Sequence, residues 1–161
     1  MVSLGNIPRA PRIPLPNPNG HWDFPELMGI NKVGFVYVIR DLVLKRGYIG
    51  KKFYRQQGLL KGGTEYPWRD YKSSSSTMSQ LMSRRPGEEF EFICLEEYAS
   101  KSGLGFGETW TLCMVEAPTT PIWYNTRIEK VAWNVRENIT FRHKERLELV
   151  QDWTNDRITK I

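Results

Sequence analysis

The sequence predicts an α+β fold, a small β-sheet flanked by helices, with its strands and helices in the order β-β-α-β-α. Three observations predict it. Two neighbouring runs rich in β-branched and aromatic residues are typical of a β-hairpin, a later run alternates polar and apolar residues, and apolar residues recur at helical spacing after both units. A chain of 161 residues suits one domain.

The hairpin is the first regular unit of the chain. One strand is predicted over Val33–Arg40 (VGFVYVIR) and a second over Gly47–Phe53 (GYIGKKF), joined by a turn at Asp41–Arg46. A glycine-rich loop, Gln56–Pro67, follows the second strand.

A helix is predicted after this loop. The serine run Ser73–Ser76 offers several N-caps, and Met78, Leu81 and Met82 follow at helical spacing until Pro86-Gly87 ends the helix.

The third strand and a second helix come next. The alternating run Glu89–Leu95 predicts the strand. We expect a break at Gly103–Gly107 and a helix over Glu108–Glu116, with Pro118 just past its end. Two faces of this helix are largely apolar, which predicts that the helix is buried. One face carries Glu108, Leu112 and Val115, and the other carries Phe106, Trp110, Cys113 and Met114.

The two ends are predicted to lie outside a main domain of residues 31–135. Residues 1–30 form a proline-rich extended arm, because prolines recur at spacings of two or three from Pro8 to Pro18 and exclude a helix. Burial of the aromatic residues in His21–Phe24 would anchor it, and the arm could bind a second copy of the chain or another protein. Residues 136–161 form a helical extension, with a charged helix over Phe141–Trp153, while Glu129–Val135 is ambiguous.

Composition excludes several classes of protein. Cys94 and Cys113 form no CxxC pair and the chain has two histidines, which excludes a structural zinc site and favours a reducing compartment. The longest apolar stretch, Val33–Ile39, has seven residues, whereas a membrane span needs about twenty. We therefore expect a soluble cytoplasmic protein without a membrane partner. His143 is expected to lie at its surface.

Charge is divided unevenly along the chain. Residues 31–85 hold twelve Lys and Arg against three Asp and Glu, whereas residues 86–125 hold one Lys against seven Glu. This division suggests that a polyanion docks on one face, although a solvated surface would give the same counts.

The sharpest functional signal lies on the predicted hairpin. Its first strand contains Phe35-Val36-Tyr37 after Gly34, and its second contains Tyr48-Ile49-Gly50, so that two tyrosines stand eleven residues apart. Together with later residues, these tripeptides resemble the GIY-YIG nuclease family, in particular a phage-encoded branch, although FVY replaces GIY. The resemblance spans residues 33–125; its later residues are Lys51-Lys52, the run Trp68–Ser74, Glu108 and Tyr124-Asn125.

The resemblance implies a fold and a set of catalytic roles. It implies a GIY-YIG-like sheet on which Tyr37 is the base that activates water and Tyr48 orients the water or assists Tyr37. Glu108 would bind one Mg²⁺ or Mn²⁺ ion. A free tyrosine has a pKa of about 10, so that nearby lysines and the metal would have to lower the pKa of Tyr37.

A cation for the phosphoryl oxygens is also expected. Where the family has an arginine, roughly ten residues after the second tyrosine, this chain has Gly58. The candidates are Lys52, Arg55 and Arg69. Lys52 is preferred, because strand alternation puts it on the face of Tyr48.

DNA is the expected partner. Asn125 is expected to have a structural role. Six other residues are expected to contact the phosphates of DNA: Lys51, Lys61, Lys72, Ser73, Ser74 and Arg84. Other interpretations stay open at this stage. The two tyrosines could be core residues, Glu108 could be solvated with Glu116 as a rival metal ligand, and the serines could simply cap a helix.

The predicted function is a metal-dependent, phage-encoded DNA endonuclease that acts in the host cytoplasm or is carried in the virion. The alternative is a non-catalytic DNA-binding or virion-associated structural protein on a degenerate fold of the same family. A structural α+β protein with an accidental motif ranks last.

Overall fold

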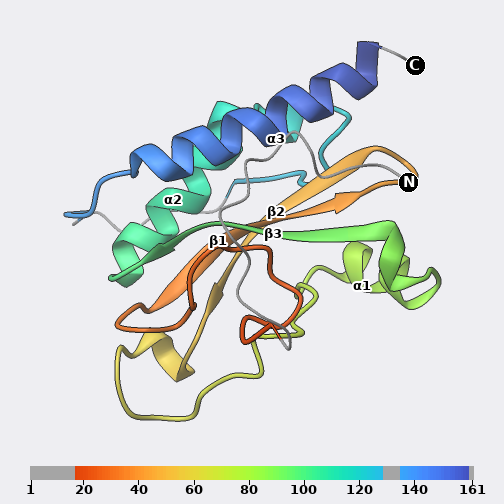
Figure 1. Ribbon diagram of the computed structural model, residues 1–161. Helices are drawn as coiled ribbons and strands as arrows, with labels where there is room; N and C mark the ends of the chain where they lie inside the picture. Colours follow the sequence, from red (N-terminus) through yellow and green to blue (C-terminus); the bar gives the residue numbers. More distant parts are fainter. Residues whose placement is uncertain (1–16, 129–134, 160–161) are drawn as a thin grey trace.

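The computed structural model describes residues 17–128 and 135–159, and for residues 153–159 the backbone alone. Within these residues three strands form one antiparallel sheet in the order β2-β1-β3 (Figure 1). Strand β1 spans Gly34–Asp41, β2 spans Arg46–Phe53 and β3 spans Phe90–Tyr98. The α+β prediction is confirmed, and β2 is an edge strand whose outer side is partly paired with the segment around Trp123.

The hairpin lies within one residue of its predicted bounds. Every residue of β1 is buried, because β1 is the central strand and both of its faces are covered. The turn is fixed by Asp41, whose carboxylate accepts hydrogen bonds from the backbone N–H groups of Val43 and Leu44. Lys45 adopts a left-handed φ of 60°, which lets the chain reverse into β2.

Strand β3 runs three residues beyond the predicted Leu95. Val36 pairs with Glu96 but the next residue, Tyr37, pairs with Cys94, so that Leu95 is the extra residue of a β-bulge. The bulge interrupts the alternation of polar and apolar residues, so the sequence pattern predicts a strand that ends at Leu95.

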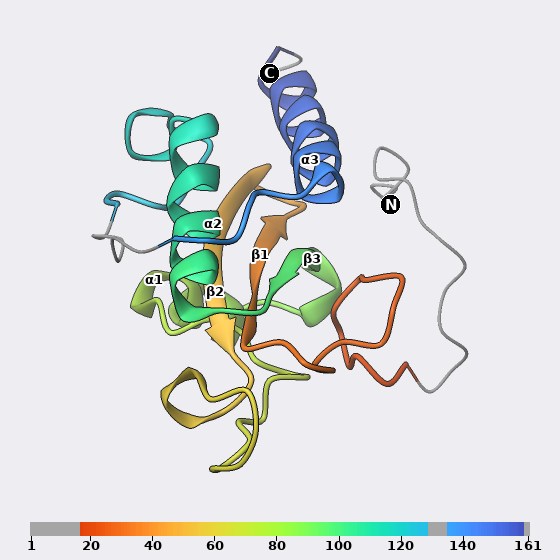
Figure 2. The same cartoon turned by 90° about the vertical axis from the view of Figure 1, so that its left-hand side faces the viewer.

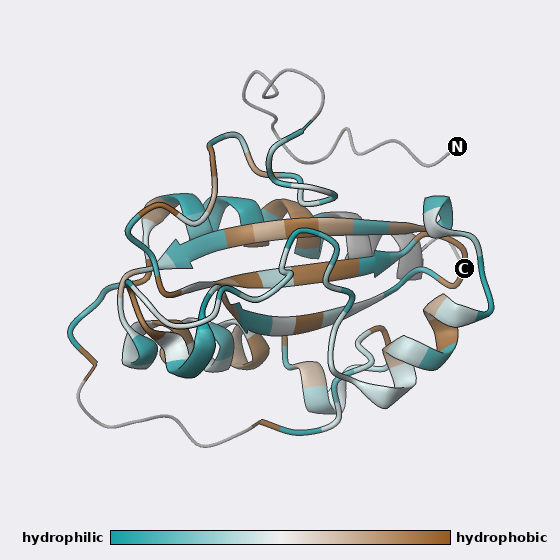
Figure 3. Ribbon diagram, turned by 90° about the horizontal axis from the view of Figure 1, so that it is seen from below, coloured by the Kyte–Doolittle hydropathy of each residue, from teal (hydrophilic) through white to brown (hydrophobic). Residues whose placement is uncertain are grey.

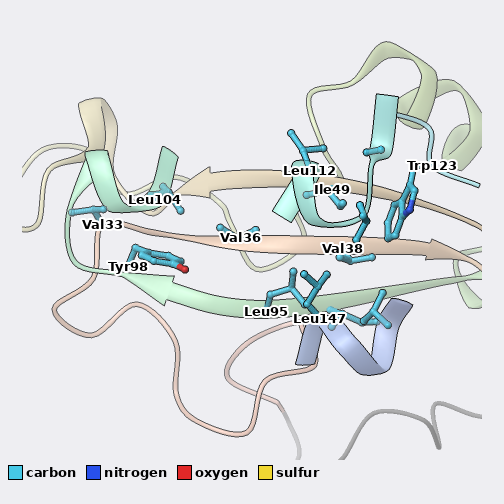
Figure 4. Packing of buried hydrophobic residues seen from close by; sticks show 14 residues of the cluster. Val33, Val36, Val38, Ile49, Leu95, Tyr98, Leu104, Leu112, Trp123 and Leu147 are labelled. Atoms are coloured by element: carbon cyan, nitrogen blue, oxygen red, sulfur yellow. The ribbon is translucent and has the colours of Figure 1, made fainter. Parts of the chain in front are cut away.

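Two layers cover the two faces of the sheet (Figures 1 and 2). The helices α2 (Lys101–Met114) and α3 (Phe141–Thr159) lie on one face, where Val36, Val38 and Ile49 meet Leu104 and Leu147 (Figure 4). Residues 17–30, the loop after β2 and the short helix α1 (Ser76–Ser83) lie on the other face. Seen from this second side, hydrophobic residues concentrate on the strands (Figure 3).

The second layer includes part of the predicted arm. Trp22 and Phe24 are buried against the sheet, as expected for the anchor, and Trp22 donates its indole N–H to the carbonyl of Trp68. The earlier prolines, up to Pro16, lie outside the described residues, as does most of the ambiguous segment 129–135.

The predicted break at Gly103–Gly107 is wrong, because helix α2 spans Lys101–Met114 without interruption. Ser100 caps it by accepting a hydrogen bond from the N–H of Gly103 at 3.0 Å. A Cβ on Gly103 would overlap the Glu137 side chain, and one on Gly107 would lie 2.8 Å from the Tyr98 ring. These glycines permit close packing of the helix, which outweighs their cost of about 1 kcal/mol in a helix interior.

The prediction that α2 is buried on two sides is half wrong. Leu112 and Val115 are buried against the sheet, whereas Cys113 and Met114 are exposed. The described part of the chain also contains three short 3₁₀ helices: Gln56–Gly58, Gly87–Glu89 and Ala117–Thr119. No helix in the described part of the chain combines the length and apolar character needed to cross a membrane.

Helix α3 spans Phe141–Thr159 and packs on the sheet through Leu147 and Val150. The surface position predicted for His143 is wrong, because this side chain is fully buried. Its Nδ1 lies 2.7 Å from the Tyr98 hydroxyl and its Nε2 2.9 Å from Thr111 Oγ1. Thr111 gives its one hydroxyl proton to the carbonyl of Gly107, so it accepts from Nε2–H, and Nδ1 accepts from Tyr98. The neutral imidazole therefore links α3, α2 and β3.

Burial of His143 predicts a loss of stability in mild acid. Burial lowers its pKa from 6.5 to about 4. The unfolded chain therefore takes up the proton first, and the free energy of unfolding should fall by about 3 kcal/mol as the pH drops from above 6.5 to 4. Urea unfolding of wild type and His143→Gln at several pH values measures this contribution. His21 titrates in the same direction, so only the difference between the two proteins reports on His143. Parallel pH profiles would contradict the assignment.

Candidate active site

Tyr37 and Tyr48 lie on the same face of the sheet. Tyr37 is opposite Gly50 and Tyr48 is opposite Ile39 in the β1–β2 register, and alternate residues of a strand share a face. Their ring centroids are 6.4 Å apart. The hairpin thus brings the two motif tyrosines together, as their spacing predicts.

Gly50 is needed for this arrangement. A Cβ on Gly50 would overlap both the hydroxyl and the ring of Tyr37, which lies across the backbone of β2. The glycine of the Tyr48-Ile49-Gly50 tripeptide therefore leaves room for the catalytic candidate on the neighbouring strand.

Tyr37 is buried and surrounded by other phenols. Its ring is 6.0 Å from that of Tyr71 in an edge-on arrangement, and its hydroxyl is hydrogen-bonded with Ser73 and Tyr71. Burial raises the pKa of Tyr37 well above its ordinary value of 10. The lowering by nearby lysines that we expected from the sequence is therefore absent, because Lys52 turns toward other rings. At neutral pH Tyr37 is a phenol.

A cavity of about 580 Å³ lies at the outer edge of β2. Tyr37 and Tyr48 line it from one face of the sheet, and Glu108 and Leu112 line it from α2 on the other face. This is possible because β2 is an edge strand, so that groups from both layers meet around it. The remaining lining residues come from β2 itself, from the start of α1 and from the loop after α2: Ile49–Lys51, Ser74–Thr77 and Tyr124–Arg127.

Glu108 is the carboxylate of this cavity among the described residues. It is largely buried, with 16% of its side chain exposed, and its Oε1 lies 3.7 Å from the ammonium of Lys51. No group of three or more His, Cys, Asp and Glu that could hold a metal occurs in the described part of the chain. One carboxylate still fits Mg²⁺, which is commonly bound by one or two carboxylates, substrate phosphates and water. Tyrosine, serine and threonine hydroxyls of the cavity are further oxygen donors.

Comparison with protein families identifies the fold's relatives. Residues 23–128 match the family model SegE_GIY-YIG, described as "Putative endonuclease segE, GIY-YIG domain". The chain belongs to the GIY-YIG nuclease family. No curated protein and no solved structure was found to match it. The match covers the whole sheet, both motif tyrosines, Glu108 and the Tyr124-Asn125 pair.

The cations that the sequence suggested in place of the GIY-YIG arginine do not line the cavity. Lys52 shares the face of Tyr37, but its ammonium lies 4.2 Å from the ring centroid of Tyr66 and 4.3 Å from that of Tyr71. Its pKa is lowered by burial. Arg55 and Arg69 both pair with Glu65, at 3.8 and 3.4 Å. These three cations therefore contact Glu65 or Tyr66 of the glycine-rich insertion, near the end of β2.

Two cationic side chains do line the cavity in the described structure, Lys51 and Arg127. Lys51 is one of the phosphate contacts expected from the sequence, whereas Arg127 is not among them. The feature of the sequence that points to Arg127 is its position two residues after Asn125. Asn125 Oδ1 accepts from the N–H of Ile49 and its Nδ2 donates to the carbonyl of Ile49, both at 2.8 Å. These two bonds join the loop after α2 to the outer edge of β2.

The other expected DNA contacts lie around the cavity or beyond it. Ser74 lines the cavity, and Ser73, with a left-handed φ of 85°, accepts a hydrogen bond from the N–H of Ser75. Ser75 then caps α1, so the serine run does serve as a helix cap. The remaining cations are exposed on the insertion, before α1 and at its end: Lys61, Lys72 and Arg84.

Gly50→Ala is expected to reduce cleavage about 100-fold, because a methyl group would push the Tyr37 ring out of place and a shift of about 1 Å can cost that much. Gly87→Ala is the matched control, since a Cβ on Gly87 meets open space. Single-turnover cleavage of a DNA duplex measures both variants. Equal rates in the two variants would contradict the role of Gly50.

Proposed function

We propose that this GIY-YIG protein is a metal-dependent DNA endonuclease that hydrolyses phosphodiester bonds in the cavity at the edge of β2. One observation carries the proposal: Tyr37, Tyr48 and Glu108, which are far apart in the sequence, line the same cavity. If the tyrosines were only core residues and Glu108 only a solvated residue, the three side chains would have no reason to line the same cavity.

Hydrolysis requires that a water oxygen bond to phosphorus while the bond to the leaving sugar oxygen breaks. Tyr37 is proposed to take the proton of this water at its phenolic oxygen, and Tyr48, which is half-buried, to orient the water. Lys51 contributes positive charge beside the reacting phosphate. A Mg²⁺ or Mn²⁺ ion, held by Glu108 and phosphate oxygens, would supply charge that polarises the phosphoryl group and favours departure of the leaving oxygen.

The state of Tyr37 limits when it can act as a base. Burial favours the phenol, so the phenolate requires additional positive charge in the cavity. A phosphate bound by Lys51 brings no positive charge into the cavity, whereas a metal ion bound by Glu108 does. Activity is therefore expected to depend on metal and to rise with pH.

The basic stretch from Lys51 to Arg85 is proposed to carry the DNA backbone past the cavity. Lys61, Lys72 and Arg84 are exposed, and Ser74 lies at the start of α1, where backbone N–H groups favour an anion. The resemblance of the run Trp68–Ser74 to a phage-encoded branch supports a phage origin. The place of action would then be the cytoplasm of the host, or the virion if the arm binds another phage protein.

A non-catalytic DNA-binding protein is the second candidate. It is favoured by two observations: Gly58 stands in place of the family arginine, and Lys52, Arg55 and Arg69 do not line the cavity. Such a protein would bind DNA through the same basic surface without cutting it.

Cleavage of supercoiled plasmid distinguishes the two candidates. The purified protein is incubated with plasmid across a range of Mg²⁺ and Mn²⁺ concentrations, with EDTA as the control. The nuclease proposal predicts nicked or linear DNA with metal and intact plasmid with EDTA. Retained binding in a gel-shift experiment without any cleavage would instead support the non-catalytic candidate.

A further inference from the structure

We propose that Arg127 binds the scissile phosphate of DNA in place of the arginine that the helical segment after β2 lacks. This inference rests on the proposed function. It names a residue that the motif does not contain, in the loop after α2.

The distribution of cations in the site supports Arg127. Lys51 and Arg127 are the Lys and Arg side chains that line the cavity within residues 17–128 and 135–159. The ammonium of Lys51 already lies 3.7 Å from Glu108, so part of its charge is balanced by that carboxylate. Arg127 places a second positive charge against the same cavity.

The loop that carries Arg127 is held in register with the catalytic strand. Asn125 makes two hydrogen bonds of 2.8 Å with the backbone of Ile49, the central residue of the second tripeptide. Nearby, Tyr124 donates its hydroxyl to Asp41 at 2.8 Å, and the guanidinium of Arg46 lies 4.1 Å from the Tyr124 ring. Asn125 is thus a positioning residue, which joins the loop two residues before Arg127 to the backbone between Tyr48 and Gly50.

The chemistry of arginine suits this position. Its guanidinium stays charged at any working pH and can donate two parallel hydrogen bonds to phosphate oxygens. Arg127 is exposed at the mouth of the cavity, where an incoming DNA backbone can reach it. Charge that develops on the phosphoryl oxygens would be stabilised by a donor fixed before the reaction.

The test compares Arg127→Ala and Arg127→Lys with Arg136→Ala. Arg136 is also exposed but does not line the cavity, so the control removes the same charge from elsewhere on the surface. Duplex binding is measured in EDTA as a function of salt concentration, and single-turnover cleavage is measured with Mg²⁺ or Mn²⁺. Thermal melting verifies that each variant folds.

Arg127→Ala is expected to lower the slope of log affinity against log salt by about 0.9, the loss of one phosphate contact. It should slow cleavage about 10²–10³-fold, with partial rescue by added guanidinium. Arg127→Lys should restore the salt slope but not the full rate. Arg136→Ala should keep the cleavage rate.

The inference is overturned if Arg127→Ala and Arg136→Ala have the same salt slope and the same rate. Failure of the proposed function looks different. If wild type cuts no DNA, that function fails, while the salt slopes measured in EDTA still decide whether Arg127 binds a phosphate.

Discussion

Tyr37→Phe is expected to slow DNA cleavage by about 10²–10⁴-fold, the usual contribution of a general base, while the fold stays intact. The change removes one hydroxyl and keeps the ring that packs against Trp22 and Tyr71. Loss of the hydrogen bonds of this hydroxyl should cost about 1 kcal/mol of stability. Single-turnover cleavage and urea unfolding measure the two effects separately.

The matched control is Tyr54→Phe. Tyr54 is another buried tyrosine in the same layer, and its hydroxyl donates to Glu97 at 2.7 Å, but it does not line the cavity. It should lose stability without losing the catalytic step. If Tyr37→Phe retains the wild-type rate, or if Tyr54→Phe loses as much, Tyr37 is only a core residue.

The pH profile adds a second signature of Tyr37. Because burial raises its pKa well above 10, the phenolate fraction at neutral pH lies on the rising part of the titration curve. The log of the cleavage rate should therefore rise by about one per pH unit between pH 6 and 8, unless bound charge lowers the pKa into that range. The residual rate of Tyr37→Phe should lack this rise.

Glu108→Gln is expected to abolish metal-dependent cleavage while DNA affinity stays nearly unchanged. Glutamine keeps the size of the side chain but removes the carboxylate charge that Glu108 contributes, which is the one carboxylate lining the cavity among residues 17–128 and 135–159. The ion pair with Lys51 is also lost, which should cost less than about 1 kcal/mol because the pair is partly exposed. Cleavage across a Mn²⁺ titration and duplex binding in EDTA measure the two properties.

Glu116→Gln serves as the control for this variant. Glu116 follows the same helix but is exposed and does not line the cavity. Full activity of Glu108→Gln would remove the metal site from Glu108, and loss of activity in Glu116→Gln alone would move it to Glu116.

The sequence predicts local structure well where the pattern is local. The strands β1 and β2 depend on β-branched and aromatic residues that face a core on both sides, and their spacing fixes the pairing of Tyr37 with Gly50. Strand β3 was predicted only as far as its bulge. The start of α2 was missed, because Gly103 and Gly107 allow the close packing of distant residues, Glu137 and Tyr98, that no local pattern reveals.

The site could be predicted only in part for the same reason. The tyrosines and Glu108 carry a motif, whereas the position of a charged group depends on what packs around it. Lys52 shares the predicted face, but the aromatic rings of Tyr66 and Tyr71 hold its ammonium. His143 is buried by Tyr98 and Thr111, which lie 45 and 32 residues away in the sequence. Arg127 lines the cavity from a loop that Asn125 joins to β2, a contact between residues 76 positions apart.

A crystal structure of Tyr37→Phe with duplex DNA and Mn²⁺ tests the central claim most directly, because the anomalous signal of manganese locates the metal without reference to activity. We expect one manganese peak beside the Glu108 carboxylate and a DNA phosphate in the cavity between Tyr48 and Arg127. Manganese bound away from Glu108, or a DNA backbone that bypasses the edge of β2, would contradict it.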